Sequence, residues 1–409
     1  MLAAILAAQP HICARGFFRK GIIATIASNR MKIIADPNIP FVREAFAALG
    51  EVQLVPGRQI DAATVRDADV LLVRSVTPVG AALLNGSRVR FIATATIGTD
   101  HIDLNYLGGR NIGFASAEGS NANSVAEYVV AALLELAHRR KFRLRDKTLG
   151  VVGVGAIGTR VVRYAEALGM RVLQNDPPRQ RAERLAEFVS LEQILGEAEI
   201  ITLHVPLTRS GPDATAHLFD RERLSALEER RPILINTARG AVVDNRALLK
   251  AIDGERVGGA VLDVWENEPN ISPELLDVVD IGTPHIAGYS FDGKVNGTRM
   301  IYEAACRFFG LQPTWTPTLP PPPVPRIKLD IRSSEDFENV LHRVVHRVYD
   351  ITADDAALRA GVRNADGIGV GFDKLRAEYP VRCEFHNTDL INGGDEKLSA
   401  TLRAVGFRL

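Results

Sequence analysis

Three residues of types suited to acid–base chemistry follow predicted β-strands in the second half of the chain: Arg239, Glu268 and His285. Histidine is the side chain whose ordinary pKa lies nearest neutral pH, so it can take the proton of a substrate hydroxyl group. A carboxylate beside the imidazole fixes its tautomer and stabilises its protonated form, which is the role expected of Glu268. The planar fork of Arg239 suits a substrate carboxylate and a developing carbonyl. Together they fit the oxidation of a 2-hydroxy acid, in which hydride leaves C2.

Taken singly, each of these residues has a more ordinary explanation: a capping arginine, a surface glutamate and a histidine in the protein core. Their joint position favours chemistry, because the carboxyl ends of parallel strands meet at one sheet edge, where ligands bind. They also lie downstream of a glycine-rich loop. We therefore predict that the three side chains form one catalytic set.

The glycine-rich loop is Gly153-Val-Gly155-Ala-Ile-Gly158, which follows an apolar run and opens an amphipathic helix. In this context the first glycine permits a tight turn and the second lets backbone N–H groups approach a pyrophosphate. The third lets the helix and the strand pack closely. The phosphates then lie at a helix N-terminus, where N–H groups favour anions. The loop predicts a dinucleotide site.

Asp176 stands at the end of the next predicted strand, eighteen positions after Gly158. A carboxylate there can accept hydrogen bonds from the adenine-ribose hydroxyls and would repel a 2′-phosphate. The alternative is a turn aspartate before Pro177-Pro178. We expect NAD as the cofactor, in preference to NADP.

The elements that position these residues alternate between strand and helix from Met31 onward, which predicts an α/β fold with two doubly wound parallel sheets of Rossmann-like or flavodoxin-like type. A long Ala/Leu/Val-rich helix at 123–140 should connect the two domains. The predicted strands are 32–35, 52–55, 70–73, 91–94 and 112–115 in the first domain and 148–152, 171–175, 200–204, 233–236, 259–263 and 279–283 in the second.

Seven prolines in residues 313–325 predict a stiff linker before a small α+β domain. Beyond it we expect a strand at 326–329, an amphipathic helix near 335–350 and a glycine-rich turn at 367–371. The predicted division is an extension at 1–30, a substrate-binding domain at 31–120 with a return segment at 286–312, an NAD-binding domain at 121–285 that opens with the connecting helix at 121–141, the linker, and a final domain at 326–409.

Composition narrows the class of protein. The 409 residues include 49 basic and 49 acidic side chains, so no net charge would draw the chain to nucleic acid. After residue 30 the sequence contains no run of eighteen apolar residues, so it predicts no membrane-spanning helix. Three well-separated cysteines offer neither a disulfide framework nor a zinc cluster, which favours the cytoplasm. Residues 1–30 contain no acidic side chain and could be a secretory or organellar signal, but we prefer to interpret them as an upstream extension outside the fold.

The motifs as a set resemble the NAD-dependent D-isomer-specific 2-hydroxyacid dehydrogenases. Within that superfamily the chain is most similar to the erythronate-4-phosphate dehydrogenases of pyridoxal phosphate biosynthesis, and the likeness covers 31–409. The residues that carry it include the glycine loop, Asn236-Thr-Ala-Arg-Gly, Asp263-Val-Trp-Glu-Asn-Glu-Pro, Pro284-His-Ile-Ala-Gly-Tyr289, Val73-Arg-Ser-Val-Thr, Thr94-Ala-Thr-Ile-Gly-Thr-Asp-His and Phe372-Asp-Lys-Leu-Arg.

The resemblance implies that His285 is the proton donor and acceptor, beside Arg239 and Glu268. It further implies a phosphorylated 2-hydroxy acid as substrate and a homodimer whose dimerisation domain is 326–409. The remaining implied contacts are Asp176, Asp263 and Gly288 to NAD, and Ser75, Thr96 and Tyr289 to the substrate. Val205 departs from the pattern, because similar proteins often have threonine there, so a hydroxyl contact to NAD is lost.

Arg74, beside Ser75, is a candidate for part of a phosphate-binding site, although a strand-end arginine paired with a local carboxylate is an equal alternative. His342 and His346 have a spacing that could bind a metal on one helix face, but no third ligand is indicated, so we expect no metal site. Two rival functions stay open: a dehydrogenase of another D-2-hydroxy acid such as 3-phosphoglycerate, and an NAD-sensing binding protein.

Overall fold

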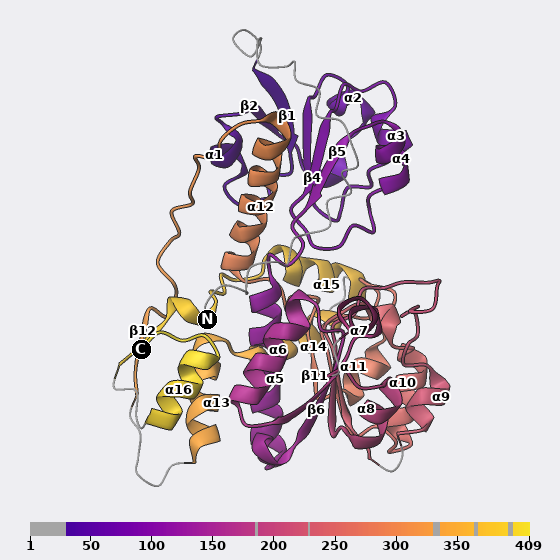
Figure 1. Ribbon diagram of the computed structural model, residues 1–409, viewed down its shortest axis with the longest axis vertical. Helices are drawn as coiled ribbons and strands as arrows, with labels where there is room; N and C mark the ends of the chain where they lie inside the picture. The colour runs from indigo at the N-terminus through magenta and orange to yellow at the C-terminus, as the bar shows by residue number, and fades with distance from the viewer. Residues whose placement is uncertain (1–29, 185–186, 228–229, 330–335, 364–366, 392–395) are drawn as a thin grey trace.

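The computed structural model describes residues 30–184, 187–227, 230–329, 336–363, 367–391 and 396–409. In these residues two parallel sheets lie one above the other, and a C-terminal segment packs beside the lower sheet (Figure 1). The predicted fold class is confirmed: two doubly wound parallel sheets and a small C-terminal α+β part. The predicted extension, except for Arg30, lies outside the described residues.

The first sheet, at the top of Figure 1, has the strand order β2-β1-β3-β4-β5 and is parallel throughout. The side chains of β3 and β4 are all buried, as expected for strands covered by helices on both faces. The elements are β1 (Met31–Ala35), α1 (Val42–Phe46), β2 (Gly50–Leu54), α2 (Ala62–Val65), β3 (Val70–Val73), α3 (Ala81–Leu84), β4 (Phe91–Thr94), α4 (Leu104–Gly109) and β5 (Gly113–Ser116).

The second sheet has the order β11-β10-β9-β8-β6-β7, also parallel. Its strand order reverses between β6 and β8, and the glycine loop follows β6 at this switch point, where doubly wound folds bind ligands. The elements are β6 (Thr148–Val152), α6 (Ala156–Ala167), β7 (Arg171–Asn175), α7 (Pro177–Glu183), α8 (Leu191–Glu197), β8 (Ile200–Leu203), α9 (Arg221–Ser225), β9 (Ile233–Asn236), α10 (Asn245–Asp253), β10 (Gly259–Leu262), α11 (Pro273–Val278) and β11 (Ile281–Gly282).

Two long helices, α5 (Ala122–Arg140) and α12 (Phe291–Phe309), begin where the two sheets meet. The α5 helix is buried along most of its length, as its apolar sequence predicts. Ser290 caps α12 by accepting the Gly293 N–H at 2.8 Å. From there α12 packs against β4 and β5, so the chain returns to the first sheet after completing the second.

The C-terminal segment follows a stretch at 311–325 that is described throughout and contains no helix or strand. This stretch runs along one side of the molecule from α12 to β12 (Figure 1). The segment contains β12 (Arg326–Lys328), α13 (Phe337–Val348), α14 (Ile351–Val362), α15 (Ile368–Ala377), β13 (Asp389–Ile391) and α16 (Glu396–Ala404). Its apolar side chains, such as Leu341 and Leu358, belong to the same buried clusters as the second sheet and its helices. The segment is therefore anchored on the core of the second sheet.

The predicted glycine-rich turn at 367–371 is wrong, because most of these residues form the first turn of α15. Gly367 has a φ of 95° and starts the helix. A Cβ atom on Gly371 would lie 2.3 Å from the Gly361 carbonyl oxygen, so glycine here lets α15 pack closely against α14. The glycines serve helix packing as well as chain reversal.

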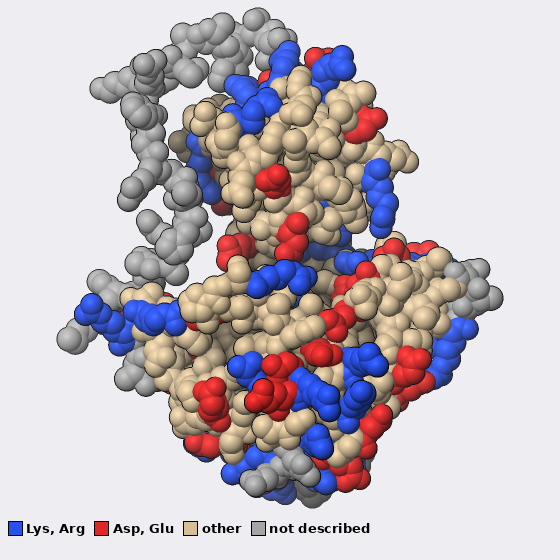
Figure 2. Space-filling view, turned by 90° about the vertical axis from the view of Figure 1, so that its right-hand side faces the viewer, with Lys and Arg blue, Asp and Glu red and all other residues tan. Residues whose placement is uncertain are grey.

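Short 3₁₀ turns complete the described elements: η1 (Gly57–Gln59), η2 (Leu144–Asp146), η3 (Gly240–Val242) and η4 (Phe385–Asn387). Among the described helices we find none with the length and apolar character needed to cross a membrane. On the face shown in Figure 2, basic and acidic side chains are interspersed, and the surface is hollowed at the level where the two sheets meet.

Candidate active site

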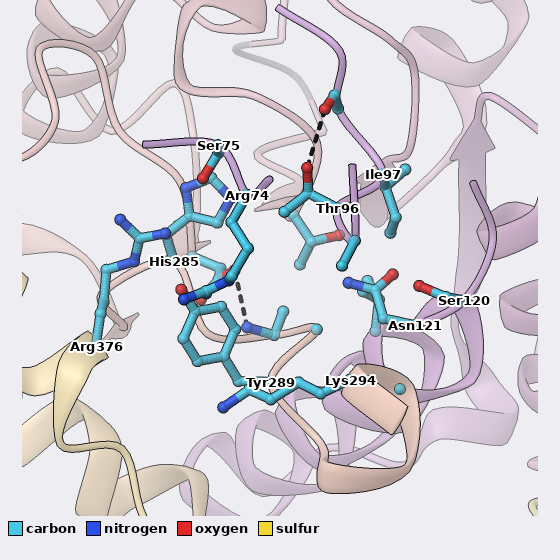
Figure 3. A pocket seen from close by; sticks show the side chains of 18 of the residues that line it. Arg74, Ser75, Thr96, Ile97, Ser120, Asn121, His285, Tyr289, Lys294 and Arg376 are labelled. Atoms are coloured by element: carbon cyan, nitrogen blue, oxygen red, sulfur yellow. Dashed lines mark hydrogen bonds between the residues drawn. The ribbon is translucent and has the colours of Figure 1, made fainter. Parts of the chain in front are cut away.

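A cavity of about 280 Å³ lies between the two sheets and is lined by residues of both. Arg74, Ser75 and Thr96 come from the first sheet, at the carboxyl ends of β3 and β4. The second sheet contributes residues that follow β9, β10 and β11. Eight residues that the sequence nominated thus line one cavity: Arg74, Ser75, Thr96, Arg239, Asp263, His285, Gly288 and Tyr289. Figure 3 labels five of them, Arg74, Ser75, Thr96, His285 and Tyr289.

His285 and Glu268 form a hydrogen-bonded pair beside this cavity, with 2.7 Å between Nδ1 and Oε2. The other carboxylate oxygen accepts the Trp265 backbone N–H at 2.8 Å. Burial alone would raise the pKa of Glu268, but the charge and hydrogen bond of His285 and the Trp265 N–H outweigh it and lower that pKa. An ionised carboxylate can only accept, so in the neutral imidazole Nδ1 carries the proton and Nε2 keeps its lone pair. This is the state needed for a general base.

Asp263 holds the turn that carries His285. Its carboxylate accepts the Thr283 hydroxyl at 2.7 Å and the backbone N–H groups of Ile286 at 2.7 Å and Ala287 at 3.0 Å. The His285 N–H donates to the Asp263 carbonyl oxygen at 2.8 Å. Burial raises the pKa of Asp263, although the charge of His285 and these hydrogen bonds oppose that rise. Asp263, which was predicted to contact NAD, thus also positions the turn that carries His285.

Arg239 reaches the cavity from the loop after β9. Its Nη1 donates to the Ala238 carbonyl oxygen at 2.7 Å, and its Nε lies 3.7 Å from Asp100 Oδ2. A Cβ atom on Gly98 would lie 2.4 Å from Arg239 Nη2, so any side chain at position 98 would displace this guanidinium from its present place. The first sheet therefore helps to place a side chain that belongs to the second.

The three glycines of the loop have the three environments that a dinucleotide site requires. Gly153 has a φ of 89°, which permits the tight turn. A Cβ atom on Gly158 would lie 2.1 Å from the Gly153 carbonyl oxygen, so α6 can pack here only on glycine. At Gly155 no described atom lies within 4 Å of where a Cβ would stand. That open approach to the N-terminus of α6 fits a pyrophosphate.

Asp176 is the N-cap of α7, as a turn aspartate before two prolines would be, and it also contacts the glycine loop. Its carboxylate accepts the Arg179 N–H at 3.0 Å and the Val154 N–H at 2.9 Å. The nearby Arg179 guanidinium is held by Glu183, with contacts of 2.7 and 2.8 Å, and so is not free for a 2′-phosphate. This arrangement fits NAD better than NADP.

Val205, the departure from the family pattern, lies beside the same loop, where its Cγ1 would be 2.8 Å from a Cβ on Gly153. An apolar side chain there offers no hydrogen bond to a cofactor. On the other side of the cavity, Thr96 Oγ1 lies 2.6 Å from Thr94 Oγ1 and 3.2 Å from the Gly98 carbonyl oxygen.

Two cations that the sequence did not nominate also line the cavity: Lys294 in the first turn of α12, and Arg376 on α15. Lys294 stands five residues after Tyr289, which is a signal that could have been read from the sequence. Arg376 lies in the Phe372-Asp-Lys-Leu-Arg motif that supported the family resemblance, but nothing local assigned it a role. The alternative for Arg74 was a strand-end arginine paired with a local carboxylate. Among the described residues Arg74 forms no such ion pair.

The His342 and His346 side chains serve contacts between and within helices. His342 Nε2 lies 2.7 Å from Glu135 on α5, and its ring stacks on His138 with centroids 4.3 Å apart. His346 pairs with Asp350 at 3.1 Å. The described residues contain no group of three potential metal ligands.

Two family models match the chain. Residues 121–287 match the NAD-binding domain of the D-isomer specific 2-hydroxyacid dehydrogenases, and residues 318–406 match a domain of unknown function, DUF3410. The first match spans the glycine loop and all three candidate catalytic residues.

Relatives match over most of the chain. An erythronate-4-phosphate dehydrogenase of Salinibacter ruber is 50% identical over 362 residues, which are 87% of this chain and 92% of the relative. This chain belongs to the erythronate-4-phosphate dehydrogenase family. A member from Cronobacter sakazakii is 47% identical over 92% of this chain and 98% of its own length.

Solved structures of other dehydrogenases are also similar to this chain. The D-lactate dehydrogenase of Aquifex aeolicus, complexed with NAD and lactic acid, has a TM-score of 0.54 and 27% identity to this chain. The match covers 68% of this chain and 95% of that one. The resemblance to D-2-hydroxyacid dehydrogenases inferred from the motifs is confirmed.

Proposed function

We propose that this chain is an NAD-dependent dehydrogenase that oxidises 4-phospho-D-erythronate to (R)-3-hydroxy-2-oxo-4-phosphooxybutanoate, a step of pyridoxal phosphate biosynthesis. The observation that carries this proposal is the 2.7 Å His285–Glu268 pair, which borders a cavity that also receives Arg239. The identity of 46–50% to erythronate-4-phosphate dehydrogenases supports the substrate.

The proposed chemistry divides between three side chains. His285 takes the C2 hydroxyl proton on Nε2, because Nδ1 is occupied by its hydrogen bond to Glu268. Glu268 stabilises the imidazolium that forms. Arg239 holds the substrate carboxylate and the carbonyl that develops at C2. When bound, NAD supplies the hydride acceptor for C2.

We assign NAD to the edge of the second sheet. Gly153, Gly155 and Gly158 would admit the pyrophosphate at the N-terminus of α6, and Asp176 would accept the ribose hydroxyls. Asp263 and Gly288, which line the cavity, would contact the nicotinamide end. Ser75, Thr96 and Tyr289 would contact the substrate from around the same cavity.

The proposed division into domains follows this chemistry. Residues 31–120 with 286–312 bind substrate, 121–285 bind NAD, and 326–409 follow the linker at 313–325. We further propose a cytoplasmic homodimer that binds no nucleic acid. Sedimentation of the full chain tests whether it is a dimer. A chain without residues 326–409 is not a suitable test, because the deletion would expose apolar residues packed against α5 and β11.

The test of the activity is a comparison of substrates. Purified protein should reduce NAD with 4-phospho-D-erythronate when a 2-oxo acid is present to recycle tightly held NADH. Turnover of 3-phosphoglycerate in its place would favour the rival dehydrogenase. Binding of NAD without turnover of either acid would favour the NAD-sensing role.

A further inference from the structure

Three cations lie around Tyr289 at one end of the cavity. The Lys294 ammonium is 4.5 Å from the centre of the Tyr289 ring, and the Arg376 guanidinium carbon is 5.6 Å from it. Figure 3 shows Arg74, Lys294 and Arg376 on different sides of this ring, and all three line the cavity. They come from three distant parts of the chain: the end of β3, the start of α12 and the end of α15.

None of the three forms an ion pair with a carboxylate among the described residues, although the charge of Arg376 is one of those that lower the pKa of Glu268. The Nε of Arg376 is a buried donor without a hydrogen-bond acceptor. Burial, followed by the charges of Arg74 and Arg382, lowers the pKa of Lys294 to about 8, which places it in a crowd of positive charge. A buried donor and mutually repelling cations are costly unless an anion joins them.

The two acidic residues that line the cavity, Asp100 and Asp263, already have other partners. Asp263 accepts three hydrogen bonds from the turn that carries His285, one of them from the Thr283 hydroxyl, and Asp100 lies next to Arg239. Neither of them pairs with Lys294 or Arg376. The end of the cavity at Tyr289 therefore carries a surplus of positive charge.

We propose that Arg74, Lys294 and Arg376 together form the subsite for the phosphate monoester of the substrate, with Arg376 supplied by the segment after the proline-rich linker. This inference rests on the proposed function, because it assigns the C4 phosphate of that substrate to these residues. It makes the C-terminal segment part of the substrate site. Guanidinium and ammonium groups around one dianion are a common arrangement for phosphate recognition.

Hydrogen bonds of the segment that follows α15 anchor that segment beside the turn that carries His285. Arg382 is buried and its Nη2 donates to the Ala287 carbonyl oxygen at 2.5 Å. Glu384 accepts the Ser124 hydroxyl at 2.8 Å and the Ser290 hydroxyl at 3.1 Å. The chain that follows α15 is thus held against the residues that follow His285, next to the cavity that Arg376 lines.

The test compares a phosphorylated with an unphosphorylated ligand in the NAD-bound enzyme. In Arg376→Met and Lys294→Met we expect KM for 4-phospho-D-erythronate, and the inhibition constant of inorganic phosphate, to rise about ten- to a hundredfold. The inhibition constant of D-erythronate, which lacks the phosphate, should stay within about twofold. Lys374→Met, an exposed cation on the same α15 helix, is the matched control and should change neither constant.

The outcomes separate the two proposals. A wild-type enzyme that does not oxidise 4-phospho-D-erythronate defeats the proposed function itself. A wild-type enzyme that does so, with variants that weaken both ligands equally or neither, overturns the phosphate subsite alone. Thermal unfolding and NAD affinity check that the variants fold. Arg376→Lys, which keeps the charge, should recover part of the phosphate affinity that Arg376→Met loses. A folded Arg376→Met with wild-type KM, or an Arg376→Lys that recovers nothing, also overturns the subsite.

Discussion

The imidazole of His285 donates from Nδ1 to Glu268 Oε2 at 2.7 Å, and the second oxygen of Glu268 is held by the Trp265 backbone N–H at 2.8 Å. The carboxylate is thus fixed from both sides, by a backbone group of its own loop and by the residue it orients. This places a base with a defined tautomer next to the cavity that Arg239 also lines.

Replacing His285 by asparagine should lower kcat by about three orders of magnitude or more, since no group then takes the hydroxyl proton. Glu268→Gln should lower kcat less, because the histidine remains but loses the charge that stabilises its protonated form. Isothermal calorimetry should give an NAD affinity close to wild type in both. Wild-type turnover by His285→Asn would remove this histidine from the mechanism.

The glycine loop offers a matched pair of substitutions. Gly155→Ala meets no described atom within 4 Å, so it should fold with an unchanged Tm but bind NAD about tenfold more weakly, because the methyl group enters the pyrophosphate approach. Gly158→Ala would set a Cβ 2.1 Å from the Gly153 carbonyl oxygen, and should lower Tm. If Gly155→Ala leaves the NAD affinity unchanged, the loop does not hold the pyrophosphate as proposed.

Gly98 gives a way to disturb Arg239 without removing any functional group. A methyl group at position 98 would approach Arg239 Nη2 to 2.4 Å and push the guanidinium aside. Gly98→Ala should therefore lower kcat/KM for the substrate by about tenfold or more while NAD affinity holds. Arg239→Lys should lower it further, since an ammonium group cannot replace the planar fork. Steady-state kinetics of the two variants check this order.

Lys294 predicts an alkaline limit on substrate binding. With a pKa of about 8, set by burial and by the charges of Arg74 and Arg382, the ammonium group loses its proton as pH rises through that value. The charged form exists below the pKa, so KM for 4-phospho-D-erythronate should rise about tenfold between about pH 7 and pH 9. Lys294→Arg stays protonated over this range and should flatten the rise. An identical alkaline limb in that variant would assign the titration to another group.

Most of the fold was predictable because its strands are continuous apolar runs. The buried strand at Val70–Val73 is an example, and it ends at the residue expected. The loop glycines were predictable for a related reason: their spacing is imposed by local geometry, a tight turn followed by close helix packing. The α15 helix was missed because Gly367 to Gly371 read as a turn, and only the facing backbone of Gly361 shows why glycine is needed there.

The candidate site was predictable where its residues follow strands, since strand ends converge at a sheet edge. His285, Glu268 and Arg239 follow this rule. Lys294 and Arg376 do not, because they come from helices whose packing brings them to the cavity. Asp176 was predicted as a ribose ligand, and the structure adds that it caps α7 and binds the Val154 N–H, two roles that sequence alone could not separate.

The measurement that tests the central claim most directly is NAD reduction by the purified full chain, with 4-phospho-D-erythronate and 3-phospho-D-glycerate offered separately and a 2-oxo acid present. The account predicts turnover with the first acid at a kcat/KM well above that for the second. No turnover of 4-phospho-D-erythronate, beside efficient oxidation of 3-phospho-D-glycerate, would contradict it.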